Sequence, residues 1–301
     1  MTIGARREPK DPISDAALIY TVGVLLNREG GMDVERQSSS VLVGIDGSDA
    51  AVGAARWAVE EAVSRAVPLV LVSVMKARHA SADDYDRDLH HAQASLEAAR
   101  AAIESTGRSV KVETEIGTGE AAALLVARSR DAELVCVGSV GVGRFARSVL
   151  GSTATEVAEG AHCPVAVIRP DGSPTAGGIR WMVASTGISD EDPVVDCALQ
   201  EARLRQLPVL LLRGRPRGGA KRAELDRCVA RWKERFPGLH IYPVFTRKDV
   251  ALFIREHSEP VEVAVVGPAI PLSWRRYSAE RIGPCCPGVA HQYLSSGADR
   301  D

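Results

Sequence analysis

The chain has 301 residues, of which 45% are apolar, and a formal net charge of −2 at neutral pH. This length and composition are typical of a folded protein of about two domains and not of a disordered chain. The balanced charge and the 4% aromatic content leave no basic stripe for phosphate backbones and few rings for stacking on bases, which argues against a dedicated nucleic-acid-binding protein.

The N-terminal residues 1–38 precede the first clear strand pattern and contain one apolar patch, at residues 16–26. This patch is too short to span a bilayer, and no small-x-small cleavage site follows it. The sequence therefore predicts neither a membrane segment nor a signal peptide. We expect residues 1–38 to be a loosely ordered extension.

From residue 41 onward, short β-branched runs alternate with amphipathic helical patterns. The first half contains five such runs, at residues 41–46, 69–76, 110–116, 134–138 and 164–169, with helical stretches at residues 49–66, 83–106, 119–129 and 151–161. This alternation predicts an α/β fold with a doubly wound parallel sheet. The continuous apolar character of the runs indicates that helices bury both faces of the sheet.

Residues 171–178 have the composition of a linker, and a second copy of the first pattern follows them. A shift of 140 residues aligns EEAVSRAVPLVL with QEARLRQLPVLL without a gap. The second copy lacks the polar residues Asp46 and Ser48, and its last strand, residues 288–294, matches poorly. We expect one domain at residues 39–170 and a degenerate second domain at residues 179–301.

The segment GSVGVGRFARSVLGST, residues 138–153, contains glycines at a spacing for which three nucleotide-binding patterns compete. The Walker A pattern fails because Phe145 stands in place of the metal-binding hydroxyl. The dinucleotide fingerprint is present at residues 141–146, but it follows the fourth strand instead of the first, and no acidic residue ends the next strand. Both patterns are therefore weak here.

The third pattern, G-x2-G-x9-G-[ST], is satisfied by Gly138, Gly141, Gly151 and Ser152. Gly138 ends a strand at the carboxyl edge of the sheet, where ligands bind, and Gly141 lets the chain pass close to a charged group. The run from Gly151 to Thr153 opens a helix with free N–H groups and the positive end of a dipole. This arrangement predicts a phosphate site, and because the loop lacks a lysine, a carboxylate pair and a histidine base, we expect no catalytic residues.

These motifs resemble the universal stress protein family, in its ATP-binding, tandem-domain, actinobacterial form. The resemblance rests on VLVGIDGS at residues 41–48, on EEAVSRAVPLVLVSV at residues 60–74, and on the segment from LLVARSRDAELVCVG to CPVAVIRP at residues 124–170. It implies two tandem five-stranded parallel sheets of the Rossmann-like, adenine nucleotide alpha hydrolase-like type. It also implies ATP as the ligand, with or without magnesium, a pseudo-dimer within the chain, a possible homodimer, and a regulatory role in stress or dormancy adaptation.

The resemblance also implies a set of nucleotide-binding residues. Asp46 would contact the ribose or adenine, the backbone of Val74 would frame the adenine, and Gly44 would flank the base. The ribose and phosphate positions fall on Val137, Gly138, Val140, Gly141, Gly151, Ser152 and Thr153.

Structural explanations stand beside these assignments. The run Asp46-Gly47-Ser48 is also typical of a turn followed by a helix N-cap. His90 and His91 lie on a polar helix without metal-ligand spacing, so no metal site is expected. The six cysteines form no C-x-x-C pair, which fits a reduced, cytoplasmic setting. Two other functions use the same fold: an ATPase or a nucleotidyl or phosphoryl transferase, and a scaffold that binds no nucleotide and docks partners.

Overall fold

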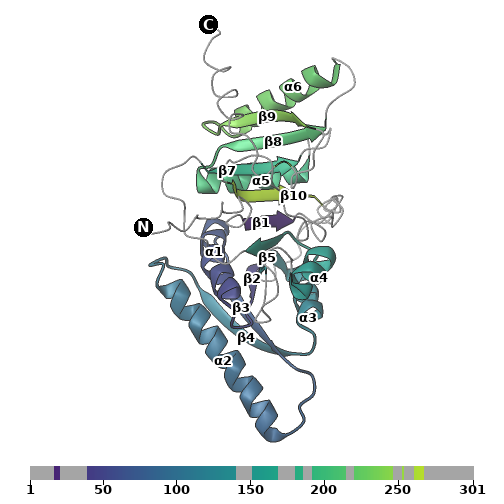
Figure 1. Ribbon diagram of the computed structural model, residues 1–301. Coiled ribbons are helices and arrows are strands. Elements are labelled where there is room, and N and C mark those ends of the chain that lie inside the picture. The colour runs from purple at the N-terminus through teal and green to yellow at the C-terminus, as the bar shows by residue number, and fades with distance from the viewer. Residues whose placement is uncertain are drawn as a thin grey trace, which may run out of the picture.

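The computed structural model describes residues 17–20, 39–139, 151–168, 180–185, 192–214, 220–246, 253 and 261–267. In these residues ten strands form one sheet in the order β4-β3-β2-β5-β6-β1-β10-β7-β8-β9 (Figure 1). Every neighbouring pair is parallel except β6 and β1, which are antiparallel. The sheet therefore has two parallel halves that meet at one antiparallel contact.

We call the elements from β2 to β6 the first lobe. Its strands are β2 (Ser40–Gly44), β3 (Leu69–Met75), β4 (Val112–Thr118), β5 (Ala132–Gly138) and β6 (Val165–Ile168), and its helices are α1 (Asp49–Arg65), α2 (Ala82–Glu104), α3 (Ala121–Arg128) and α4 (Ser152–Gly160), with a 3-10 turn at Ser129–Asp131. The predicted doubly wound parallel fold is confirmed here, and each element lies within a few residues of its expected position.

We call the elements from β7 to β10 the second lobe. It contains β7 (Trp181–Ser185), β8 (Val209–Gly214), β9 (Ile241–Thr246) and β10 (Val261–Val266), with α5 (Pro193–Arg205) and α6 (Ala220–Arg235). Among the described residues the lobe has four strands of its own, whereas five were expected, because the expected last strand at residues 288–294 lies outside them. The adjoining strand is β1 (Ala17–Tyr20), so these four residues of the expected loose extension are instead part of the sheet.

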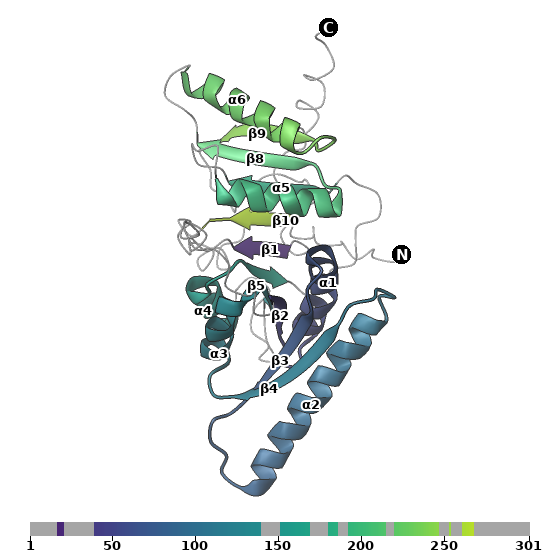
Figure 2. The same cartoon turned by 180° about the vertical axis from the view of Figure 1, so that it is seen from behind.

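The helices form two layers on the sheet. Residues of α1, α2, α5 and α6 share one apolar core on one face, which runs through both lobes, and α3 and α4 pack on the other face. The view from behind shows α5 and α6 along the second lobe and α1 and α2 along the first (Figure 2). Six buried alanines on α1 let this helix approach the sheet closely: Ala50, Ala51, Ala54, Ala55, Ala58 and Ala62.

The ends of α1 and α5 repeat one another. Ser48 caps α1 by accepting a hydrogen bond from the Ala51 N–H, and Asp192 caps α5 in the same way through the Val194 N–H. Both helices end on a non-glycine residue in the left-handed region, Ala66 with φ 55° and Gln206 with φ 56°. These two residues are separated by the 140-residue shift of the sequence repeat, so the repeat extends to the backbone conformation.

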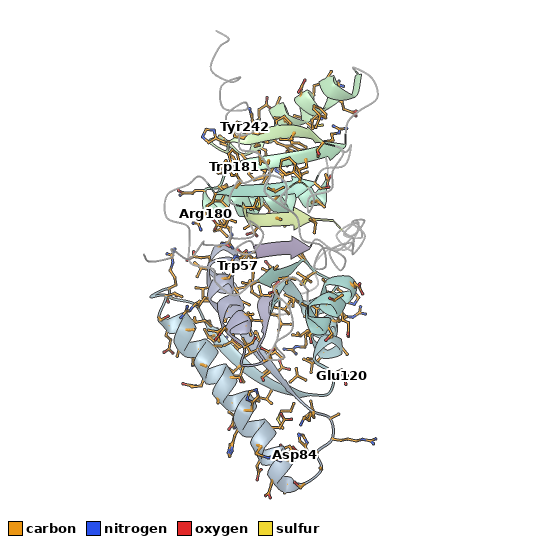
Figure 3. All side chains as sticks on the ribbon, in the orientation of Figure 1. Trp57, Asp84, Glu120, Arg180, Trp181 and Tyr242 are labelled. Carbon is orange, nitrogen blue, oxygen red and sulfur yellow. The ribbon has the colours of Figure 1, made fainter. Side chains whose placement is uncertain are left out.

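The two lobes meet through α1 and α5. Arg65 of the first lobe contacts Glu201 of the second, and Glu61 of the first lobe contacts Arg205 of the second. The guanidinium of Arg205 lies 4.2 Å from the centre of the Trp57 ring, and Figure 3 shows Trp57 at this junction. The contact is reciprocal, as in a two-fold interface, because each lobe gives the same two residue types to the other.

Candidate nucleotide site

A cavity of about 390 Å³ opens at the carboxyl ends of β2, β3 and β5 in the first lobe. The chain runs from β2 to β3 on one side and returns to β5 on the other, so the cavity lies at the topological switch point where doubly wound sheets bind ligands. The described residues that line it are Gly44, Ile45, Asp46, Ser48, Ala51, Val72, Ser73, Val74, Asp88, His91, Ala92, Ala121, Leu125, Val137, Gly138, Gly151, Ser152, Thr153 and Ala154.

Most of the residues expected from the sequence come together in this cavity. They are Gly44, Asp46, Val74, Val137, Gly138, Gly151, Ser152 and Thr153. The other two expected residues, Val140 and Gly141, lie outside the described residues. The strand ends and the start of α4, which are far apart in the sequence, therefore border one space.

The start of α4 is fixed by two backbone hydrogen bonds that lead to β6. The Gly151 N–H donates to the Ser139 carbonyl at 2.8 Å, and the Ser139 N–H donates to the Ile168 carbonyl at 2.7 Å. The first bond within the helix runs from the Thr155 N–H to the Gly151 carbonyl at 3.0 Å, so the amides of residues 152–154 have no helical acceptor. These three amides and the helix dipole make the end of the cavity at α4 suited to an anion.

Asp46 has a structural role at the start of α1. Its Oδ1 accepts hydrogen bonds from the Ser48 N–H at 3.0 Å and from the Ser48 hydroxyl at 2.6 Å, and Ser48 in turn caps the helix. The turn explanation from the sequence is therefore confirmed. Since both bonds use Oδ1 and the residue is exposed, the turn role is compatible with a second role toward a ligand.

Gly138 has a packing reason to be glycine that the sequence did not reveal. A Cβ atom at this position would lie 2.8 Å from the carbonyl carbon of Ala50 and from the nitrogen of Ala51. In the second lobe the corresponding glycine is Gly267, where an added Cβ would lie 2.9 Å from Val194 Cγ2 of α5. The absence of a side chain at Gly138 thus lets α1 cross the end of β5, whether or not a ligand is bound.

The wall of the cavity formed by α2 was missed by the sequence analysis. It consists of Asp88, His91 and Ala92, which share one face of the helix, and His91 Nε2 lies 3.3 Å from the Asp46 carbonyl oxygen. A signal existed, because a helix that begins just beyond the carboxyl end of a strand has its first turns over the crevice. The sequence relates His91 only to metal binding, for which its spacing is unsuited, and gives no direct indication of its place in this wall.

Asp88 joins this wall to the loop that follows β3, and it carries a negative charge. Its Oδ2 lies 2.9 Å from His79 Nε2 and accepts a hydrogen bond of 2.9 Å from the Lys76 N–H. These two bonds lower the pKa of Asp88 below its ordinary value. This wall therefore suits hydroxyl or amino donors better than phosphate.

The loop between β3 and α2 is held by a second carboxylate, Asp84. This residue lies at the start of α2, at the end of the molecule away from the second lobe (Figure 3). Asp84 Oδ2 accepts a hydrogen bond of 3.1 Å from the Ala80 N–H, and Ser81 caps the helix by accepting from the Asp84 N–H at 3.2 Å. The Ala80 bond lowers the pKa of Asp84, so the loop is fixed by two ionised side chains on consecutive turns of α2.

The fold and the cavity define a doubly wound α/β protein with a ligand crevice at its switch point. The description "Universal stress protein family" belongs to the family model that matches residues 38–169. The universal stress protein Rv2624c of Mycobacterium tuberculosis strain H37Rv is 51% identical over 236 residues, which cover 77% of this chain and 87% of that protein. The chain belongs to the universal stress protein family.

A further relative and a solved structure are also similar to this chain. The universal stress protein Rv2028c of the same strain is 39% identical over 222 residues, covering 70% of this chain and 78% of that protein. The crystal structure of a universal stress protein from Archaeoglobus fulgidus aligns with a TM-score of 0.54 at 15% identity, covering 77% of this chain and 78% of that one. This structural likeness extends over both lobes and supports the fold.

Proposed function

We propose that the first lobe binds ATP and that the chain is a regulatory protein of stress or dormancy adaptation. The observation that carries this proposal is the cavity of about 390 Å³ bordered by the start of α4, where the amides of residues 152–154 have no acceptor within the helix. Pockets of this size are typical of small-molecule and cofactor sites. Membership of the universal stress protein family supports the stress-related role.

The charges around the cavity favour one orientation of the nucleotide. Asp46 and Asp88 carry carboxylates at the end bordered by α1 and α2, which would repel phosphate and accept hydrogen bonds from ribose hydroxyls. We therefore propose that the phosphate tail lies on residues 151–153 and the adenine lies near Val74 and Gly44. Val137, Gly138, Val140 and Gly141 would hold the ribose and the first phosphates, and magnesium would bind through the phosphates.

Simple magnitudes support binding of moderate strength. Three hydrogen bonds from amides to a charged phosphate contribute about 1.5 to 3 kcal/mol each, and the helix dipole adds about 0.5 to 1 kcal/mol. These contributions sum to about 5 to 10 kcal/mol before the cost of ordering the ligand, so contacts to the adenine and ribose must also contribute to the net affinity. We expect binding without rapid turnover, because none of the described residues that line the cavity is a lysine or arginine.

The second lobe has a different role in this proposal. The counterpart of Ser73 in the 140-residue shift is Arg213, whose residue is 5% exposed. A bulky cation therefore stands where the first lobe has a small cavity-lining residue. We propose that the second lobe supports the first as the other half of a pseudo-dimer and binds no nucleotide.

Two observations bear on the proposed cytoplasmic location. In the part of the chain that the structure describes, every helix is too short or too polar to cross a bilayer. Cys136, Cys163, Cys197 and Cys228 are free thiols, and burial raises the pKa of Cys163 and of Cys197 to about 12. Free, unreactive thiols fit the reduced compartment expected from the cysteine pattern.

The proposal is tested by titration calorimetry with ATP and with adenosine. In Ser152→Glu an added carboxylate at the start of α4 would repel phosphate while remaining favourable for the helix. We expect ATP binding to weaken at least tenfold and adenosine binding to change less than twofold. The exposed α2 substitution Ala98→Glu adds the same charge away from the cavity and should leave both affinities unchanged. An equal loss of affinity for ATP and adenosine, or no ATP binding by the wild type, would contradict the proposed site.

A further inference from the structure

We propose that β1 takes the place of the fifth strand of the second lobe and closes an edge at which two copies of the chain would otherwise pair. β1 comes from the N-terminal segment, which precedes both lobes in the sequence. It lies between β6 and β10 and is hydrogen-bonded to both, and both views show it at the middle of the sheet (Figures 1 and 2).

The pairing partner of β1 shows which strand it replaces. β5 and β10 are equivalent strands, since residues 134–138, LVCVG, correspond to residues 263–267, VAVVG. In the first lobe β5 pairs in parallel with β6, with Val135 opposite Val165. In the second lobe β10 pairs in parallel with β1, with Ala264 opposite Leu18. β1 therefore stands beside β10 as β6 stands beside β5, in the same direction and register.

The contact between β1 and β6 has the symmetry of a two-fold interface. By the equivalence above, Leu18 corresponds to Val165, Ile19 to Ala166 and Tyr20 to Val167. In the antiparallel pairing Leu18 lies opposite Val167, Tyr20 opposite Val165, and Ile19 opposite Ala166 at the centre. Leu18 pairs with Val167, and the counterparts of these two residues, Val165 and Tyr20, also pair with each other, as is the rule for isologous contacts.

The sequence of the segment suits a strand paired on both sides. Ala17-Leu-Ile-Tyr20 is a continuous apolar run with a β-branched and an aromatic residue, as is typical of strands buried in a parallel sheet. Without this strand, β6 and β10 would each expose unpaired N–H and C=O groups, and such edges are templates for pairing with another chain. The two-fold geometry of β6 makes a second copy of this chain the fitting partner for the open edge.

The full chain with Ile19→Pro tests this role, because proline removes a ladder donor from a strand that is paired on both sides. We expect amide hydrogens of β6 and β10 to exchange at least tenfold faster than in the wild type, with β3 and β4 unchanged, and light scattering to show dimers at micromolar concentration. Glu29→Pro, outside the strand, should behave as the wild type. Unchanged exchange in β6 and β10 would contradict the proposal that β1 replaces the fifth strand of the second lobe. Faster exchange in a variant that stays monomeric would contradict the proposal that β1 prevents pairing with a second copy.

A second measurement does not depend on how the proline variant folds. Opposite residues of antiparallel strands have Cα atoms about 4.5 to 5.5 Å apart, which is within the range of a disulfide. We expect the double variant Ile19→Cys, Ala166→Cys to form a disulfide between the introduced thiols within one chain, as mapped by mass spectrometry of the oxidised monomer. Absence of that intrachain bond, with Ile19→Cys alone as the control, would contradict the placement of β1, whatever the outcome of nucleotide binding.

Discussion

Glu201 of the second lobe accepts a hydrogen bond of 2.9 Å from Arg65 of the first lobe, although Glu201 is only 3% exposed. The fully buried Glu61 lies beside this pair and contacts both Arg65 and Arg205. Burial is the main reason why the pKa of Glu201 is raised from an ordinary value of 4.5 to about 7, and the charge of Glu61 adds to it. The lobe boundary therefore holds a carboxyl group that titrates near neutral pH.

This titration predicts a specific dependence of stability on pH. Between about pH 4.5 and 7 the folded protein holds a proton on Glu201 that the unfolded chain has already released. The contribution of this group to the free energy of unfolding is therefore greatest below pH 4.5 and falls as pH rises through 7. Urea unfolding of the wild type should lose more stability between pH 5 and 7.5 than Glu201→Gln, which cannot titrate. Equal losses in the two proteins would contradict the assignment.

The buried pairs at the lobe boundary should matter more than exposed ones. Arg205 contacts Glu61 with 11% of its side chain exposed, whereas the Arg108–Glu60 pair has side chains that are 57% and 39% exposed. Arg205→Met leaves a buried carboxylate without one of its partners and is expected to lower the free energy of unfolding by about 3 kcal/mol. Arg108→Met should cost at most about 1 kcal/mol. Chemical unfolding of the two variants compares them, and similar losses would contradict the structural role of the boundary.

Two glycines at opposite extremes of packing give a matched pair of alanine substitutions. A Cβ at Gly138 would meet the α1 backbone at 2.8 Å, whereas nothing lies within 4 Å of a Cβ at Gly53 on α1. Gly138→Ala should destabilise the fold by about 1 to 3 kcal/mol, and Gly53→Ala should stabilise it by about 0.5 to 1 kcal/mol. Thermal unfolding measures both changes. A Gly138→Ala variant as stable as the wild type would show that α1 does not prevent a side chain at position 138.

Asp46 and Ser48 can be separated by comparing stability with ATP affinity. Ser48→Ala removes the N-cap of α1 and is expected to cost about 1 kcal/mol of stability. Asp46→Asn keeps the acceptor oxygen for Ser48 but loses the charge, so we expect little change in stability and a several-fold weaker affinity for ATP if the carboxylate contacts the ribose. An unchanged affinity in Asp46→Asn would leave Asp46 as a turn residue alone.

The first lobe could be predicted from the sequence because its signals are local and agree with one another. Strand runs such as residues 134–138, the helix-capping Ser48 and the repeat of Glu61 and Arg65 each reflect short-range constraints. The placement of Gly151 near Gly138 also followed, because a helix that comes after a parallel strand begins at the carboxyl edge of the sheet.

Other features depend on contacts between segments that are distant in the sequence. The α2 wall with Asp88 and His91 requires knowledge of where the helix lies over the sheet. The packing of Gly138 against Ala50 joins residues far apart in the chain. Ala17–Tyr20 is apolar but too short to be assigned to a sheet before its partners β6 and β10 are known.

The amides at the start of α4 are proposed to donate hydrogen bonds to the phosphate tail of ATP. Nuclear magnetic resonance of isotope-labelled protein can follow the amides of Ser152, Thr153 and Ala154 during titration with ATP and, separately, with adenosine. We predict saturable shifts of these three amides with ATP that adenosine does not cause. Saturable ATP binding that leaves all three amides unchanged would contradict the claim.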